Sequence, residues 1–172
     1  MHHCLSVASS LAVAFPTDRA EGGLVYGHWS DEQEKCLDVA MSHPLVMIAS
    51  DGIPFVDGQA HPRGAGTFAR FLGIYVREKG CVDMMSAIRK ITLGPVQRLE
   101  RFVPAMRTKG RLSPGMDADV TVFDPRTVID RATLRVPAQA SAGIAHVLVN
   151  GVFVVQVRPC SAWFLAARVR SR

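Results

Sequence analysis

The sequence predicts an α/β segment that is followed by an all-β segment. A helical pattern over residues 31–43 leads at once into the apolar run 45–49, and a helix followed directly by a strand is half of an α/β unit. Beyond residue 118 the chain instead consists of β-branched runs separated by turn residues, which is typical of an antiparallel sheet. The character changes near Gly110, so we expect the fold class to be α/β plus β.

The first helix is expected to begin after Ser30 and to end before Pro44. Ser30 and Gln33 have the spacing of a capping box, in which each side chain bonds to the other's backbone, and proline stops a helix. The run 45–49, with the sequence Leu-Val-Met-Ile-Ala, is short, continuous and bounded by turn residues. These properties favour a strand that is buried on both faces of a parallel sheet.

Two further helices are expected before the change of character. The first covers residues 67–79, with Gly80 as its C-terminal cap. Its apolar face is formed by residues at helical spacing, namely Phe68, Phe71, Leu72 and Tyr75. The next covers residues 84–93, is capped by Asp83 and ends at Gly94-Pro95. Its apolar side is formed by Met85, Ile88 and either Ile91 or Leu93, and we interpret the methionines as core residues.

The all-β segment is expected to contain one strand and a hairpin. Residues 119–123 form a β-branched run closed by a turn at Asp124-Pro125. Residues 144–149 and 152–157 flank Asn150-Gly151, a pair that tolerates the positive φ angles of a type I′ turn.

Composition indicates a globular protein. The 172 residues are 48% hydrophobic and 20% charged, which is enough for one core and argues against disorder. No apolar stretch reaches the roughly 18 to 20 residues of a membrane span, so we expect no membrane partner. The net charge is +5, but apart from the tail 168–172 the basic residues are scattered. We therefore expect solvated surface rather than contact with nucleic acid.

The four cysteines lie far apart, which argues against both a zinc knuckle and a disulfide framework. Reduced thiols are typical of the cytoplasm, where we expect the protein to be. The apolar segment 5–15 includes Ala12-Val13-Ala14, which is similar to a signal-peptidase site, but no Lys or Arg precedes it. Ordinary buried structure is therefore the expectation for this segment.

Asp51 lies where the apolar run 45–49 gives way to Ser50-Asp51-Gly52. Parallel strands present functional groups at their carboxyl ends, so Asp51 is a candidate acid or base at the tip of a strand. The alternative is a plain turn, in which Asp bonds to the backbone and Gly takes a positive φ. The local sequence leaves both readings open.

Nine short motifs occur in an order and spacing that resemble the amidohydrolase superfamily, and more narrowly the N-acyl-D-amino-acid deacylases, also called D-aminoacylases. They are Ser50-Asp51-Gly52, His61-Pro62-Arg63, Gly66-Thr67-Phe68, Tyr75-Val76-Arg77-Glu78, Ala87-Ile88-Arg89-Lys90, Ala118-Asp119-Val120, Phe123-Asp124-Pro125, Asp130-Arg131-Ala132-Thr133 and Val149-Asn150-Gly151. The resemblance extends from about residue 21 to residue 155.

The resemblance implies a metal-dependent (β/α)₈ barrel with a small β-sandwich. A closed barrel needs about 250 residues, so this chain is expected to supply only its C-terminal portion. We expect residues 21–109 to be the terminal part of the barrel and residues 110–157 to be a segment of the sandwich. The segment 1–20 and the basic tail 158–172 match no part of the family.

The resemblance also implies a chemistry and three site residues. In the family a divalent metal, usually zinc, activates water to attack the amide of an N-acyl amino acid. Asp51 corresponds to the carboxylate that takes the proton from water, passes it to the amine and can touch the metal weakly. Arg63 corresponds to the arginine that holds the carboxylate of the substrate, although a surface loop arginine is the alternative. His61 is expected to shape this pocket or to bond to a neighbour.

The remaining metal ligands of the family would lie upstream of residue 21. His2 and His3 would point to opposite faces of a strand, so the two could not bind one metal. Three further histidines are interpreted as structural or exposed, namely His28, His43 and His146. We therefore expect little activity from the chain alone. The alternatives are a fragment of a cyclic-amide hydrolase, and a non-catalytic module that self-associates or pairs with a missing barrel half.

Overall fold

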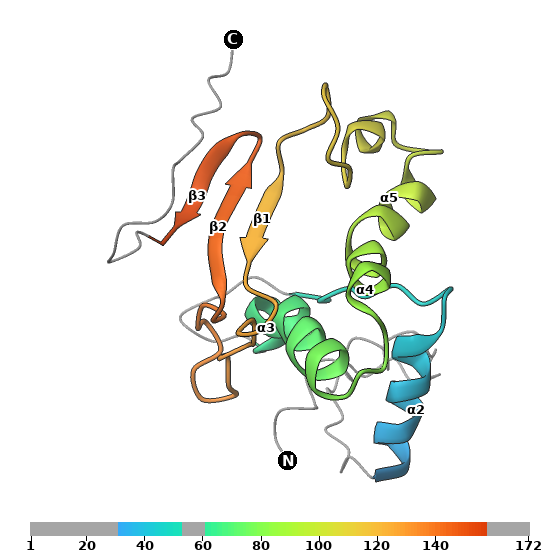
Figure 1. The fold of residues 1–172 in the computed structure, drawn as a ribbon, viewed down its shortest axis with the longest axis vertical. Coiled ribbons are helices and arrows are strands. Elements are labelled where there is room, and N and C mark those ends of the chain that lie inside the picture. Colours follow the sequence, from blue (N-terminus) through green and yellow to red (C-terminus); the bar gives the residue numbers. More distant parts are fainter. Residues whose placement is uncertain (1–30, 53–60, 158–172) are drawn as a thin grey trace, which may run out of the picture.

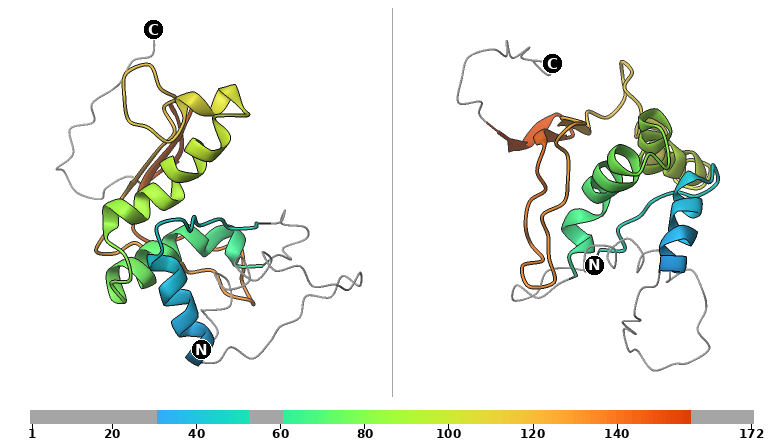
Figure 2. Two further views of the ribbon diagram at one scale, coloured as in Figure 1. Left: turned by 90° about the vertical axis from the view of Figure 1, so that its right-hand side faces the viewer. Right: turned by 60° about the horizontal axis from the view of Figure 1, so that its bottom comes forward.

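The computed structural model describes residues 31–52 and 61–157, so Ser30, the segment 1–20 and the tail 158–172 lie outside it (Figure 1). The helical elements are α2 (Asp31–Ser42), α3 (Arg63–Arg70), the π-helix η1 (Phe71–Glu78), α4 (Met84–Ile91), α5 (Leu93–Leu99) and the 3₁₀ helix η2 (Pro104–Thr108). The strands are β1 (Val120–Phe123), β2 (Ile144–Val149) and β3 (Val152–Gln156). The sheet and the α4–α5 pair extend from the region of α3 as two separate parts (Figures 1 and 2).

Helix α2 confirms the first predicted helix. It ends at Ser42, two residues before Pro44, because proline cannot continue a helix. Its inner face contributes Leu37 and Met41 to the core. On its outer side, the ammonium of Lys79 bonds to the carboxylates of Glu34 and Asp38, which ties α2 to the end of η1.

The prediction of a strand over residues 45–49 is wrong, because no strand is present there among the described residues. Leu45 lies in a turn, and residues 46–49 form neither helix nor strand and belong to no sheet. Ile48 is 5% exposed and Leu45 is 70% exposed, so burial is one-sided. A strand needs a neighbouring ladder for its backbone groups, and here the amide of Ile48 instead bonds to the carbonyl of Lys90, at 3.4 Å.

The second predicted helix is present but begins at Arg63, four residues earlier than expected, and becomes a π-helix after Arg70. Gly80 adopts φ +63° after it, as expected of a C-terminal cap. Phe68 was expected to be in the core and is 44% exposed. The reason is that α3 turns polar side chains inward, and Arg63, Thr67 and Arg70 are all buried.

The third predicted helix is α4, and Asp83 caps it by accepting a hydrogen bond from the amide of Ser86 at 3.0 Å. It ends at Ile91, and Pro95 does not terminate a helix but lies in the first turn of α5, where its missing N–H is tolerated. Met85, expected in the core, is 73% exposed. None of the helices in the described ranges is long and apolar enough to cross a membrane.

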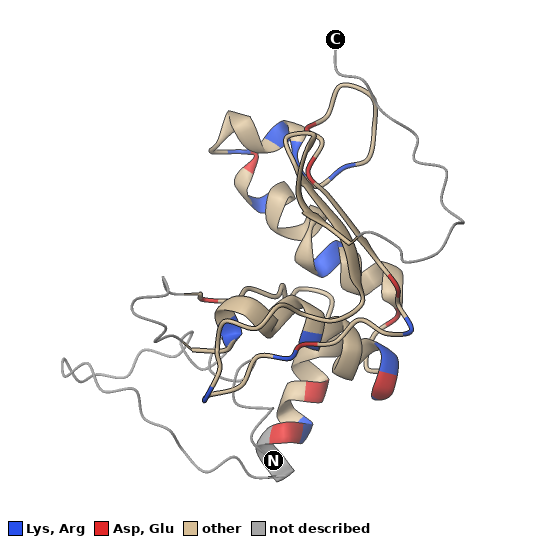
Figure 3. Cartoon of the chain, turned by 90° about the vertical axis from the view of Figure 1, so that its left-hand side faces the viewer, with Lys and Arg blue, Asp and Glu red and all other residues tan. Residues whose placement is uncertain are grey.

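The predicted hairpin is confirmed. Asn150 and Gly151 have φ +50° and +78°, the two positive angles of a type I′ turn. The strands form an antiparallel sheet in the order β1-β2-β3. Strands β2 and β3 carry no charged residue (Figure 3), yet every residue of β3 is exposed. No second sheet covers them among the described residues, so the sandwich stays a prediction.

The longest helical stretch, residues 63–78, packs against the segment 128–132 through close contacts and one buried ion pair. A Cβ on Gly66 would lie 2.9 Å from the Cβ of Asp130, so only glycine allows this approach. Arg70 and Asp130 are joined at 3.4 Å between Nη1 and Oδ2, and their side chains are 6% and 7% exposed. Val128 in the same segment is fully buried. This packing joins the helices to the sheet.

The substitution Asp130→Asn is expected to lower the free energy of unfolding by about 3 to 5 kcal/mol, because it leaves the charge of Arg70 buried without a partner. Urea unfolding followed by circular dichroism measures this loss. The control is Glu78→Gln, which breaks the exposed ion pair with Arg77 and is expected to change stability by about 1 kcal/mol or less. Equal losses for the two variants would contradict the assigned role of the buried pair.

Candidate active site

Asp51 follows the irregular segment 46–50 and adopts φ +46°. This left-handed backbone is uncommon outside glycine, although Asp is one of the residues that tolerate it best. The amide of Gly52 donates to Oγ of Ser50 at 3.3 Å, so a local turn is present. In the alternative reading as a plain turn, Gly52 was to take the positive φ, but the structure places the positive φ on Asp51.

Arg63 is the first residue of α3, and its guanidinium holds Asp51 at two points. Its Nη2 lies 3.0 Å from Oδ2 of Asp51, and its Nε donates to the backbone carbonyl of Asp51 at 2.8 Å. The Arg63 side chain is 6% exposed, whereas that of Asp51 is 44% exposed. Arg63 is therefore not a surface loop arginine but a buried cation with a half-exposed carboxylate beside it.

His61 lies next to this pair and is 6% exposed. Its Nδ1 accepts a hydrogen bond from the backbone amide of Arg63 at 3.2 Å. A neutral imidazole with an acceptor at Nδ1 carries its proton on Nε2. Burial, reinforced by the charge of Arg63, lowers the pKa of His61 below its usual value. The ring is thus held in its neutral form with Nε2–H available as a donor.

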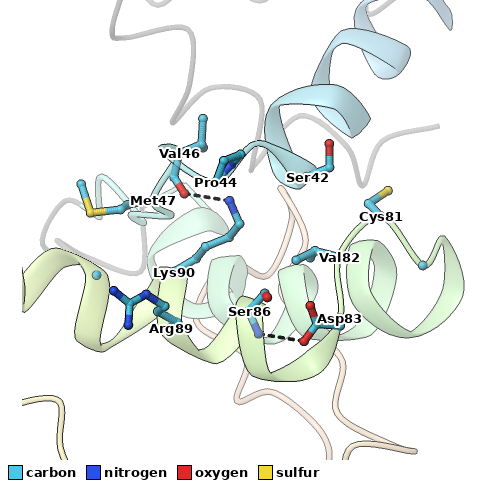
Figure 4. Close-up of a pocket in the computed structure, with 12 residues that line it drawn as sticks. Ser42, Pro44, Val46, Met47, Cys81, Val82, Asp83, Ser86, Arg89 and Lys90 are labelled. Atoms are coloured by element: carbon cyan, nitrogen blue, oxygen red, sulfur yellow. Dashed lines mark hydrogen bonds between the residues drawn. The ribbon is translucent and has the colours of Figure 1, made fainter.

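A cavity of about 450 Å³ lies between the segment 44–47 and α4, and it does not include Asp51, His61 or Arg63 (Figure 4). Lys90 reaches into it from α4 and donates to the carbonyls of His43 and Val46, the latter at 3.0 Å. Burial lowers the pKa of this lysine. Since its donors serve the backbone of the segment that leads to Asp51, we interpret Lys90 as a residue that holds this segment in place.

The described residues do not form a metal site. No three side chains of His, Cys, Asp or Glu within residues 31–52 and 61–157 lie close enough together to hold a metal ion. Asp51 therefore belongs to no group of three potential ligands in this part of the chain. The same holds for His43 and His146, and His2, His3 and His28 lie outside the described residues.

The structure thus places Asp51 against Arg63, and Arg63 against His61. Their roles stay predictions. The sequence analysis missed two supporting features. One is the pair of bonds from Lys90 to the carbonyls of His43 and Val46, and the other is the buried ion pair of Arg70 and Asp130. A signal for Lys90 was present, because a lysine three residues after Ala87 lies on the apolar side of its helix.

Comparison with known proteins shows which family the sequence of this chain matches. A sequence model of the amidohydrolase family matches residues 37–155. N-acyl-D-glutamate deacylase of Alcaligenes xylosoxydans xylosoxydans is 46% identical over 119 residues, which are 69% of this chain and 23% of that protein. D-aminoacylase of the same organism is 43% identical over 110 residues, which are 64% of this chain and 22% of that protein.

Two solved structures have the same fold over the matched part. N-acyl-D-glutamate deacylase from Bordetella bronchiseptica, complexed with zinc and a phosphonate inhibitor that mimics the tetrahedral intermediate, has a TM-score of 0.63 at 44% identity. The match covers 74% of this chain and 26% of that one. A D-aminoacylase with a binuclear metal centre has a TM-score of 0.63 at 36% identity, and the match covers 72% of this chain and 25% of that one.

The chain therefore spans about a quarter of the length of the relatives that it matches. The match nevertheless covers more than half of this chain and includes all three candidate site residues. On this basis, the chain belongs to the amidohydrolase family.

Proposed function

We propose that this chain is the C-terminal portion of an N-acyl-D-amino-acid deacylase, a hydrolase of non-peptide amide bonds. The observation that carries the proposal is the direct contact between Asp51 and the buried Arg63, in a chain that is similar to such deacylases. The proposed barrel part is 21–109 and the proposed sandwich part is 110–157. A cytoplasmic location and self-association stay expectations.

Asp51 is proposed to transfer the proton during hydrolysis. Breaking an amide requires a group that removes a proton from water and delivers one to the departing amine, and a positioned carboxylate can do both. The Asp51 side chain is 44% exposed, so water and a substrate can reach it. Its backbone is fixed by the bond from Nε of Arg63 to its carbonyl, which limits where the carboxylate can turn.

Arg63 and His61 are proposed to bind the carboxylate of the substrate. A guanidinium pairs with a carboxylate through parallel N–H groups and keeps its charge at every physiological pH. The Nε2–H group of neutral His61 offers a further donor without adding a second charge. Both residues are buried, which strengthens such bonds relative to the same bonds in water.

The support for a divalent metal comes only from the relatives. One solved structure is described as a complex with zinc, and another as having a binuclear metal centre. The described residues of this chain do not fit such a site, so no step is assigned to a metal here. We propose that the metal ligands would come from an upstream barrel part, on the same or on a separate chain.

A chimera tests the proposal. Residues 37–155 of this chain would replace the matching segment of the N-acyl-D-glutamate deacylase of Alcaligenes xylosoxydans xylosoxydans, which is 46% identical to this chain. We expect the chimera to hydrolyse N-acyl-D-glutamate, and Asp51→Asn to lower its kcat by about 10²- to 10⁴-fold, the usual contribution of a proton-transfer group. The control Glu78→Gln should leave kcat unchanged. A folded chimera whose activity does not depend on Asp51 would disprove the proposed role.

In the same chimera, Arg63→Lys is expected to raise KM by about tenfold or more, because lysine keeps the charge but loses the planar donor fork. The fall in kcat should be much smaller than for Asp51→Asn. Steady-state kinetics with N-acyl-D-glutamate separate the two parameters. An unchanged KM would count against carboxylate binding by Arg63.

The chain alone is expected to be inactive. With zinc added, the purified protein should release no measurable methionine from N-acetyl-D-methionine, since its described residues offer no metal site. The assay is paired with the Asp51→Asn variant, whose background rate should be the same. Robust turnover that disappears in Asp51→Asn would show that the chain does hold a working metal centre.

His61 is expected to make the folded chain less stable in mild acid. Its pKa is lowered in the folded state, so below about pH 6.5 the unfolded state binds a proton that the folded state does not, and stability falls as the pH falls. The loss due to His61 is at most about 1.4 kcal/mol per pH unit. Urea unfolding at pH 7.5, 6.5 and 5.5 should show a weaker pH dependence in His61→Asn. Identical pH dependences for both proteins would refute this assignment.

A further inference from the structure

The cavity of about 450 Å³ between the segment 42–47 and α4 lies apart from the proposed hydrolase residues (Figure 4). Its volume is in the range of sites that hold small molecules. Asp51, His61 and Arg63 do not line it, so the chemistry of any ligand depends on other residues. The wall of the cavity combines one buried charge with apolar surface, and each of these restricts what can bind.

The buried charge belongs to Lys90, which is 6% exposed. An ammonium group has three N–H donors, and two of them bond to the carbonyls of His43 and Val46. Among the described residues, the third donor has no acceptor and the charge has no carboxylate partner. A buried cation without a counter-charge is unfavourable. An anion at this side of the cavity would therefore be stabilised.

The other charged residues of the wall do not supply that anion. Arg89 is a second cation, and its Nη2 donates to the neutral amide oxygen of Gln97 at 2.7 Å. Asp83 is the one carboxylate that lines the cavity in the described part of the chain. It caps α4 by accepting from the amide of Ser86, and it lies well apart from the ammonium of Lys90 (Figure 4). The side of the cavity at Lys90 is thus positively charged.

Apolar side chains form another part of the wall. This apolar wall consists of Pro44, Val46, Met47 and Val82 (Figure 4). An inorganic anion at Lys90 would leave the apolar wall in contact with water, whereas an apolar group placed against it would remove that surface from water, which is favourable. The cavity therefore matches a molecule that has one anionic group and a short apolar body.

We propose that this cavity binds a small organic acid, with its carboxylate at the ammonium of Lys90 and its carbon chain against the apolar wall. The site is separate from the proposed hydrolase site and needs neither a metal nor a reaction. Lys90 also bonds to the backbone of the segment that leads to Asp51. An acid bound to Lys90 would therefore stabilise the folded arrangement of that segment, because it binds the folded chain and not the unfolded one.

Titration of butanoate into the full chain, followed by NMR, tests the proposal. We expect the methyl signal of Met47 and the amide signal of Val82 to shift together with one Kd. Acetate is shorter by two methylene groups and should bind about tenfold more weakly, because it removes less apolar area from water. Equal affinities for the two acids would overturn the proposal. A shift of the Arg63 amide while Met47 and Val82 stay unchanged would also overturn it, because the acid would then bind at the proposed hydrolase site.

Two variants test the role of the buried charge. Lys90→Gln keeps a donor for the backbone carbonyls but removes the charge, and it should weaken butanoate binding by about tenfold or more. The control Arg98→Gln removes a positive charge from an exposed residue of α5 outside the cavity and should leave the affinity unchanged. An unchanged affinity in folded Lys90→Gln would disprove the proposal. If Lys90→Gln does not fold, the wild-type titration decides, since it needs no variant.

Discussion

The buried packing of residues 63–78 against the segment 128–132 is the constraint on which the rest of the structure depends. Arg70 and Asp130 form an ion pair with both side chains below a tenth exposed, and Gly66 lets the backbone of α3 approach Asp130 closely. A buried ion pair adds little net stability compared with apolar packing, but it penalises every arrangement that separates its partners. It therefore fixes the rotation of α3 about its axis. Since Arg63 lies on the same helix, two turns before Arg70, its inward direction follows from this pairing.

The position of Asp51 depends on charged groups rather than on a sheet. In a complete parallel sheet, neighbouring strands bond to the backbone on both sides. Here the ammonium of Lys90 bonds to the carbonyls of His43 and Val46, and Nε of Arg63 bonds to the carbonyl of Asp51. Two buried cations, Lys90 and Arg63, thus hold the two ends of the segment 43–51. They explain how this segment keeps a defined course although no strand pairs with it in the described part of the chain.

Local signals were sufficient for the elements whose hydrogen bonds are local. Pro44, Asp83, Gly80 and Asn150-Gly151 act on their own neighbours, and α2, α4, the end of η1 and the hairpin agree with them. The strand at 45–49 failed because its ladder depends on chain far away in the sequence. The prediction that Phe68 lies in the core failed because α3 turns Arg70 inward instead. A buried Arg70 is tolerable only because it pairs with Asp130, sixty residues later in the sequence. For the site, the resemblance supplied Asp51, His61 and Arg63, but their contact needed the structure, since twelve residues separate Asp51 from Arg63.

The unsatisfied donors of Arg63 and His61 are unfavourable for folding, and their presence beside Asp51 is informative for that reason. A core selected for stability alone would replace a buried guanidinium by an apolar side chain of similar volume, which is often neutral or stabilising. Strain and unmet hydrogen bonds persist where a ligand later uses them. Here the two donors are fixed before any ligand binds, by the first turn of α3 and by the bond between the Arg63 amide and Nδ1 of His61. A ligand that used these donors would therefore not lose free energy in ordering them.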